Sequence, residues 1–267
     1  MAISDQLTLL NNTKTAIRTA INNKGGSVGA NDTFASYATA IDNLPSGGSG
    51  NPVLTSIDVS DFSGTTFNDA KNYITGVTIP SGVTNIGNFA FQNCTSLTSV
   101  TIPSSVTSIA QSVLQGCTSL TSVTIPDSVT SIGRNLLTNC RSLTSVTLSN
   151  NLTSIAEECF GYCTSLTSVT IPSSVTSIAQ FAFRGCSSLT GIEFPSTVTN
   201  IGWASFNDCS SLKSIIVNAT TPPTLGSAPF TNTNNCPIYV PAASVEAYKA
   251  ASGWSDYASR IQAIPSE

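Results

Sequence analysis

The chain has 267 residues, of which 40% are apolar, 7% aromatic and only 9% charged, whereas charged residues make up about a quarter of an ordinary soluble domain. Ser and Thr take their place with 41 and 36 copies, 77 of 267 positions, so hydroxyl groups must form most of the polar surface. The chain has no His, which excludes Ser-His-Asp and Cys-His catalysis and His-ligated zinc, and its net charge of −4 offers no basic surface for nucleic acid.

Two short helices are predicted within residues 1–44. Ser4 is a suitable N-cap for the first, which ends at Gly25-Gly26. The apolar side chains of both helices are candidate assembly contacts, namely Leu7, Leu10, Ile17, Ile21, Phe34, Tyr37, Ile41 and Leu44. Because such helices have too little core to stand alone, we expect a helical anchoring or assembly module that docks on sister chains, as in a homotrimer, or on a larger particle. Residues 45–52 are expected to be a Gly/Ser linker.

The N-terminal module resembles a module of bacteriophage proteins. Residues 15–25 read TAIRTAINNKG and residues 34–41 read FASYATAI, which is similar to the short N-terminal module of phage tail and head-fibre proteins. The resemblance implies a virion protein whose residues 1–44 contact other virion proteins. The first ten residues lack the segments of a signal peptide and no apolar run reaches about 18 residues, so neither a leader nor membrane insertion is expected.

The middle of the chain repeats every 23 residues. The period is marked by Cys94, Cys117, Cys140, Cys163, Cys186 and Cys209, and the apolar positions between them align as well. Units of this length cannot bury an apolar side alone, so they stack into a solenoid. Each L-x-x-V-x-I stretch predicts a short strand that pairs in parallel with the next turn. The rest of each turn is expected to return as an irregular or short helical segment, with pairs such as Val113/Leu114 facing inward.

Hydroxyl side chains flank the central apolar residue of each predicted strand and are expected to point outward, onto a concave face. The candidate ligand-binding residues of this face are Ser99, Thr101, Ser122, Thr124, Ser145, Thr147, Ser168, Thr170, Glu193 and Lys213. Hydroxyl groups suit a glycan or a protein surface, although they also suit plain solvation of a strand. Ice-binding proteins use similar ladders, but Gly191 and Glu193 interrupt this one.

The repeats resemble the BspA-like bacterial leucine-rich repeats, whose pattern C-x-x-L-x-x-V-x-I-P-x-x-V-x-x-I-G-x-x-A-F is matched from about Asn72 to Cys209. The unit at Cys140 departs from the pattern with Leu148-Ser-Asn-Asn-Leu152, where a different turn is expected. The resemblance implies an α/β leucine-rich-repeat solenoid over residues 53–217 and a C-terminal cap over residues 218–267.

No constellation for catalysis is found. The eight cysteines are expected to be free, buried thiols, with Cys209 and Cys236 as the pair best placed to join if any do. The pair Glu157-Glu158 is interpreted as solvated charge. Phe89, Phe181 and Trp203 are expected on the convex side, where they cover the core or, as the alternative, contact a partner. We therefore expect no enzyme, no cofactor and no metal site.

Two functions follow from the two resemblances. The first is a non-enzymatic virion fibre or attachment protein that displays the solenoid to a host-surface protein or glycan. The alternative is a BspA-like adhesin at the bacterial cell surface, which binds a host protein or glycan.

Overall fold

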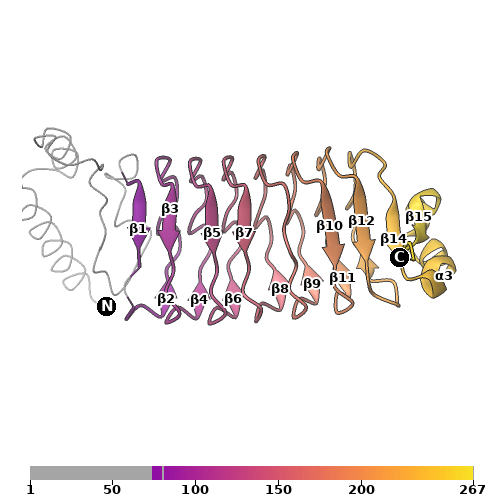
Figure 1. The fold of residues 1–267 in the computed structure, drawn as a ribbon, viewed down its shortest axis with the longest axis horizontal. Helices are drawn as coiled ribbons and strands as arrows, with labels where there is room; N and C mark the ends of the chain where they lie inside the picture. The colour runs from indigo at the N-terminus through magenta and orange to yellow at the C-terminus, as the bar shows by residue number, and fades with distance from the viewer. Residues whose placement is uncertain (1–73, 80, 267) are drawn as a thin grey trace, which may run out of the picture.

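The computed structural model describes residues 74–79 and 81–266, which form an elongated solenoid whose turns lie side by side along its long axis (Figure 1). The predicted helices in residues 1–44, the linker 45–52 and the start of the repeat region lie outside the described residues.

Each turn contributes one segment to the strand face, the side of the solenoid that carries the predicted strands (Figure 1). The strands of this face are β1 (Gly76–Thr78), β3 (Ser99–Thr101), β5 (Ser122–Thr124), β7 (Ser145–Thr147), β10 (Gly191–Phe194), β12 (Ser214–Val217), β14 (Ile238–Val240) and β15 (Ile261–Ala263). Paired strands are parallel and join residues 23 apart, as in Val77↔Val100 and Ile238↔Ile261. The sequence period is therefore the step from one strand to the next, and β14 and β15 continue it beyond residue 217.

The strand face is hydrogen-bonded in three sections, β1-β3, β5-β7 and β10-β12-β14-β15. Residues 168–170 lie between the second and third sections. We predicted a strand there, but these residues do not form one. Their Ser and Thr side chains are nevertheless exposed, like those of the paired strands.

The returning segment of each turn contains a two-residue strand and is otherwise irregular, so the irregular alternative is confirmed and the short helix is wrong. Strands of two residues follow one another there, namely β2 (Asn85–Ile86), β4 (Ser108–Ile109), β6 (Ser131–Ile132), β8 (Ser154–Ile155), β9 (Ser177–Ile178), β11 (Asn200–Ile201) and β13 (Thr224–Leu225). The α/β class is thus wrong for the described repeats, because a segment this short cannot nucleate a helix, whereas a Ser-Ile pair places one side chain out and one in. Among the described residues, helices occur only near the C-terminus, as η1 (Ala242–Ser244), α3 (Val245–Ala250) and η2 (Ser255–Arg260).

A third side, the turn side, consists of residues 88–93 and their equivalents at steps of 23. Its backbone bonds each turn to the next, for example from Phe160 N to Ala182 O (2.8 Å) and from Phe183 N to Ser205 O (2.7 Å). Two positions of each turn have positive φ. They are occupied by Phe89, Ser112, Asn135, Glu158, Phe181 and Ala204, and by Asn93, Gly116, Asn139, Tyr162, Gly185 and Asp208. Asn, Asp and Gly dominate the second set because they tolerate the left-handed region best.

The predicted apolar positions form one continuous core. The leucines of the strand position, from Leu97 to Leu212, are fully buried, and the pairs that were expected to face inward, such as Val113/Leu114, are buried too. All eight cysteines are buried and unbridged, Cys209 and Cys236 included. Five cysteine thiols also donate to a backbone oxygen 26 residues earlier, as Cys163 Sγ does to Leu137 O (3.2 Å). The thiol is thus a small core side chain with a satisfied donor.

The unit that departs from the repeat pattern replaces its hydroxyl contact. In regular turns a Ser or Thr donates to the carbonyl oxygen 22 residues earlier, as Ser128 Oγ does to Val106 O (2.6 Å). In the Cys140 unit the buried Ser149 hydroxyl donates instead to Val129 O (2.6 Å), and Asp127 accepts from the backbone N of Asn150 (2.8 Å). The turn itself is unchanged, since Leu152 N donates to Ser149 O (3.3 Å) as Val129 N does to Pro126 O (2.9 Å). The predicted change of turn is therefore wrong, and only the side-chain contacts differ.

The C-terminal residues close the end of the core (Figure 1). Trp254 and Tyr248 are fully buried against each other, with ring centroids 4.9 Å apart. Tyr248 Oη donates to Ala219 O (2.8 Å) and Trp254 Nε1 donates to Pro223 O (2.8 Å), so both polar atoms are satisfied. In the part of the chain that the structure describes, no helix has the length and apolar character needed to cross a membrane.

Candidate binding face

The strand face presents the predicted hydroxyl residues to solvent. All ten candidate residues, from Ser99 to Lys213, are exposed. The register places Ser122 beside Ser145 and Thr124 beside Thr147, so the hydroxyl groups form two lines across successive turns. The structure therefore brings together the side chains that the sequence singled out.

The outward hydroxyls differ from other Thr hydroxyls of the same turns. Thr98, Thr144 and Thr190 lie just before the strand positions, and their Oγ1 atoms donate to carbonyl oxygens 23 residues earlier at 2.8–3.2 Å. Within the described residues, no hydrogen bond is donated by the side chains of the candidate Ser and Thr residues 99, 101, 122, 124, 145, 147, 168 and 170. Thr at the first position holds the turns together, whereas the outward pair leaves its hydroxyls free for a ligand.

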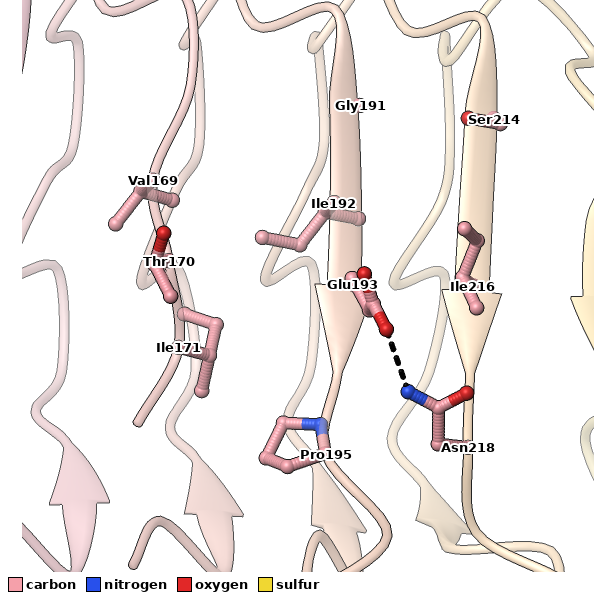
Figure 2. A pocket seen from close by; sticks show the side chains of 10 residues that line it. All are labelled: Val169, Thr170, Ile171, Gly191, Ile192, Glu193, Pro195, Ser214, Ile216 and Asn218. Atoms are coloured by element: carbon pink, nitrogen blue, oxygen red, sulfur yellow. Dashed lines mark hydrogen bonds between the residues drawn. The ribbon is translucent and has the colours of Figure 1, made fainter. Parts of the chain in front are cut away.

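A depression of about 500 Å³ lies on the strand face where the chemistry of the ladder changes (Figure 2). It spans residues 169–171, β10 and β12, together with Asn218. Figure 2 shows Thr170, Glu193 and Ile216 on three successive turns, with the Glu193 side chain turned toward Asn218. Glu193 Oε1 accepts a hydrogen bond from Asn218 Nδ2 at 2.7 Å.

The depression has two causes in the sequence. Gly191 stands where other turns carry an outward Ser. A Cβ atom at Gly191 would lie 3.6 Å from Ser214 Oγ, which is an ordinary contact distance. The missing side chain therefore leaves open space beside Ser214. Glu193 and Ile216 stand where other turns carry Thr, which gives this section one carboxylate and one half-buried apolar side chain.

These groups favour a ligand that donates hydrogen bonds. Within the described residues, the second oxygen of the Glu193 carboxylate makes no hydrogen bond, and Thr170 and Ser214 line the same depression. Ile216 adds an apolar contact at the edge. A hydroxyl-rich sugar or the amine and amide groups of a peptide match this arrangement.

The sequence singled out Glu193 but not Asn218, because Asn218 follows β12, beyond the residues that were matched to the repeat pattern. The loss of Ser at Gly191 was a visible signal that the ladder opens there. Lys213 is exposed but does not line the depression. The candidate assembly residues from Leu7 to Leu44 lie outside the described residues.

The buried thiols are poor candidates for chemistry. Burial raises the pKa of the Cys140 and Cys209 thiols from 9.0 to about 12, and it also raises the pKa of Cys159, Cys163 and Cys186. A thiol that keeps its proton is a weak nucleophile and a weak metal ligand. Over residues 74–79 and 81–266, no group of three or more Cys, Asp or Glu is placed to hold a metal ion.

Comparisons with solved structures return leucine-rich-repeat proteins. A leucine-rich repeat protein from Bacteroides ovatus is 25% identical, over 62% of this chain and 55% of its own, with a TM-score of 0.47. A leucine rich cell surface protein from Faecalibacterium prausnitzii is 26% identical, over 55% of this chain and 60% of its own, with a TM-score of 0.37. A leucine-rich repeat protein from T. pallidum is 24% identical, over 61% and 78%, with a TM-score of 0.47. The chain thus spans little more than half the length of the first two.

The sequence itself matches a family model. Among curated proteins the chain finds no match. None of the comparisons supports the resemblance of residues 15–41 to phage fibre proteins. The model of the BspA type leucine-rich repeat region, by contrast, matches six copies over residues 60–176 and 153–250, which together cover more than half of the chain. The chain therefore belongs to the BspA-type leucine-rich repeat family.

Proposed function

We propose that this chain is a non-enzymatic binding protein of the bacterial cell surface, which holds a host protein or glycan on its strand face. The observation that carries the proposal is the set of exposed outward Ser and Thr side chains whose hydroxyls are not used by the fold. Family membership adds support, since BspA-type repeats are typically non-catalytic. The virion role expected from residues 1–44 stays a prediction from sequence.

The repeats supply what such a face needs. Parallel backbone pairing fixes the spacing of neighbouring side chains at about 4.8 Å, so a ligand meets the same groups at regular steps. The depression at Glu193 adds one position with a different charge and shape. A rigid, pre-organised array loses little side-chain entropy when it binds.

The test is a pair of double variants of the full chain, probed on a glycan array and on immobilised extracellular-matrix proteins. Thr124→Arg with Thr147→Arg fills the strand face with two bulky, charged side chains and is expected to weaken binding about tenfold or more. Ser131→Arg with Ser154→Arg places the same change on exposed positions of the two-residue strands and serves as the matched control. Equal binding by the two double variants would show that the strand face is not the binding site.

The location is tested separately on intact cells that produce the protein. Brief protease treatment is expected to remove the chain from such cells while a cytoplasmic marker survives. Protection of the chain until the cells are lysed contradicts the surface location.

A further inference from the structure

A second surface of the molecule carries an exposed aromatic side chain. Trp203 lies on the turn side and is 50% exposed, the one exposed large hydrophobic residue among the described residues. The expectation that Trp203 covers the core was therefore wrong. The core beneath it is already closed by Phe183 and Phe206, which are fully buried and stacked at 4.9 Å.

The tryptophan is also unusual for its position. In the preceding turns the equivalent residue is polar, namely Asn88, Gln111, Arg134, Glu157 and Gln180. Several of these side chains bond along the solenoid, as Arg134 Nε does to Gln111 Oε1 (3.1 Å). An indole at this position gives up such a contact and leaves apolar area in water, which the fold itself does not need.

One aromatic ring contacts the indole, and two further side chains extend the cluster behind that ring. The Phe181 and Trp203 rings lie 4.6 Å apart with an interplanar angle of 56°. The Arg184 guanidinium lies over the Phe181 ring at 5.4 Å and over the Tyr162 ring at 5.5 Å. Gly185 makes room for Tyr162, since a Cβ there would lie 2.6 Å from the tyrosine ring. We call these four side chains, Tyr162, Phe181, Arg184 and Trp203, the aromatic platform.

Polar groups border the aromatic platform. Gln180 precedes Trp203 by one turn and donates from Nε2 to Glu157 Oε1 at 2.8 Å. Within the described residues, the side-chain oxygen of Gln180 and the second oxygen of Glu157 make no hydrogen bond. The exposed indole thus follows a carboxylate and an amide that accept hydrogen bonds, at equivalent positions of the two preceding turns.

From this arrangement we infer that the aromatic platform is a saccharide-binding site, distinct from the strand face, that takes a neutral pyranose ring. A pyranose has an apolar C–H face that packs on an indole and hydroxyls at its edge that donate to Gln180 and Glu157. A stable protein interface needs about 800 Å² per partner with an apolar centre, far more than one ring supplies. Nucleobases also stack on aromatic rings, but Glu157 and the net charge of −4 oppose a phosphate backbone.

The test uses the tryptophan as its own reporter. The chain has two tryptophans, and Trp254 is fully buried, so a ligand at the aromatic platform acts on Trp203 emission. The full chain is titrated with the neutral hexaoses of N-acetylglucosamine, glucose and mannose. We expect at least one hexaose to change the emission in a saturable manner, and the Trp254→Phe variant to keep that change.

The matched variants separate this site from the strand face. Trp203→Gln restores the residue type of the preceding turn and is expected to lower affinity about tenfold in calorimetry, with an unchanged melting temperature as proof of folding. The variant with Thr124→Arg and Thr147→Arg is expected to bind the sugar normally, so failure of the strand-face proposal does not affect this result. The inference is overturned if none of the three hexaoses binds, or if Trp203→Gln binds as well as the parent chain. The inference is also overturned if an immobilised matrix protein shields Trp203 and none of the sugars does.

Discussion

Phe160 and Phe183 are 23 residues apart, and their rings stack with centroids 4.9 Å apart and planes 12° apart. Phe206 continues the stack in the next turn at 4.9 Å and 11°. In the earlier turns the same position holds Phe91, Leu114 and Leu137, so this stack of three rings begins at Phe160. The C-terminal half of the core thus contains a continuous aromatic stack, which Leu114 and Leu137 separate from the buried Phe91.

Truncation of this stack is expected to be costly. Phe183→Ala leaves a cavity between two rings and should lower the free energy of unfolding by about 3–5 kcal/mol, whereas Phe183→Leu should cost about 1–2 kcal/mol. Urea denaturation of both variants measures the difference. Equal losses for Ala and Leu would mean that the site collapses around either side chain.

The buried thiols predict alkaline unfolding. Above pH 9 a thiol in the unfolded chain loses its proton, whereas the folded thiols of Cys140 and Cys209 keep theirs until about pH 12. The folded state then binds more protons, so its stability is complete below pH 9 and falls as pH rises from 9 to about 12. Each such thiol adds about 1.4 kcal/mol per pH unit to the slope.

The slope is measured by urea denaturation at several pH values. Cys140→Ala should reduce it by the contribution of one thiol, while the surface variant Ser131→Ala should leave it unchanged. A slope that Cys140→Ala does not alter would argue against ionisation of this thiol as a cause of unfolding.

The residues with positive φ on the turn side predict that stability depends on which residue type occupies these positions. Asn139 has φ of 62° and its backbone N donates to Gly161 O at 2.7 Å. Asn139→Val places a β-branched residue in this region and should cost about 1–2 kcal/mol. Asn139→Gly should be nearly neutral, because Gly occupies the equivalent positions 116 and 185. Thermal melting compares the two, and a Gly variant as unstable as the Val variant would refute the backbone explanation.

The C-terminal end of the core depends on one buried hydroxyl. Tyr248→Phe leaves the buried Ala219 carbonyl without the hydroxyl that donates to it, which should cost about 1–3 kcal/mol. Tyr239→Phe is the control, because the hydroxyl of the half-buried Tyr239 makes no hydrogen bond within the described residues. Denaturant titration should show a loss for Tyr248→Phe alone.

The sequence determined the solenoid, its core and the outward hydroxyls. A period of 23 residues puts equivalent side chains beside each other, and alternation within a strand fixes which of them face outward. The burial of Cys159 and the exposure of Thr124 both follow from these two periods. The irregular course of the returning segment was predicted, but its strands were not, because a strand of two residues, such as Ser108–Ile109, is too short to show a period.

Only the tertiary structure decided where this regular surface becomes specific. The depression needs Gly191, Glu193 and Asn218 together, and the Glu193–Asn218 contact joins residues 25 apart, off the repeat period. The aromatic platform likewise joins Arg184 to Tyr162 at a separation of 22. A repeat period fixes contacts between equivalent positions, whereas contacts between non-equivalent positions of neighbouring turns depend on the path of the backbone and on side-chain rotamers.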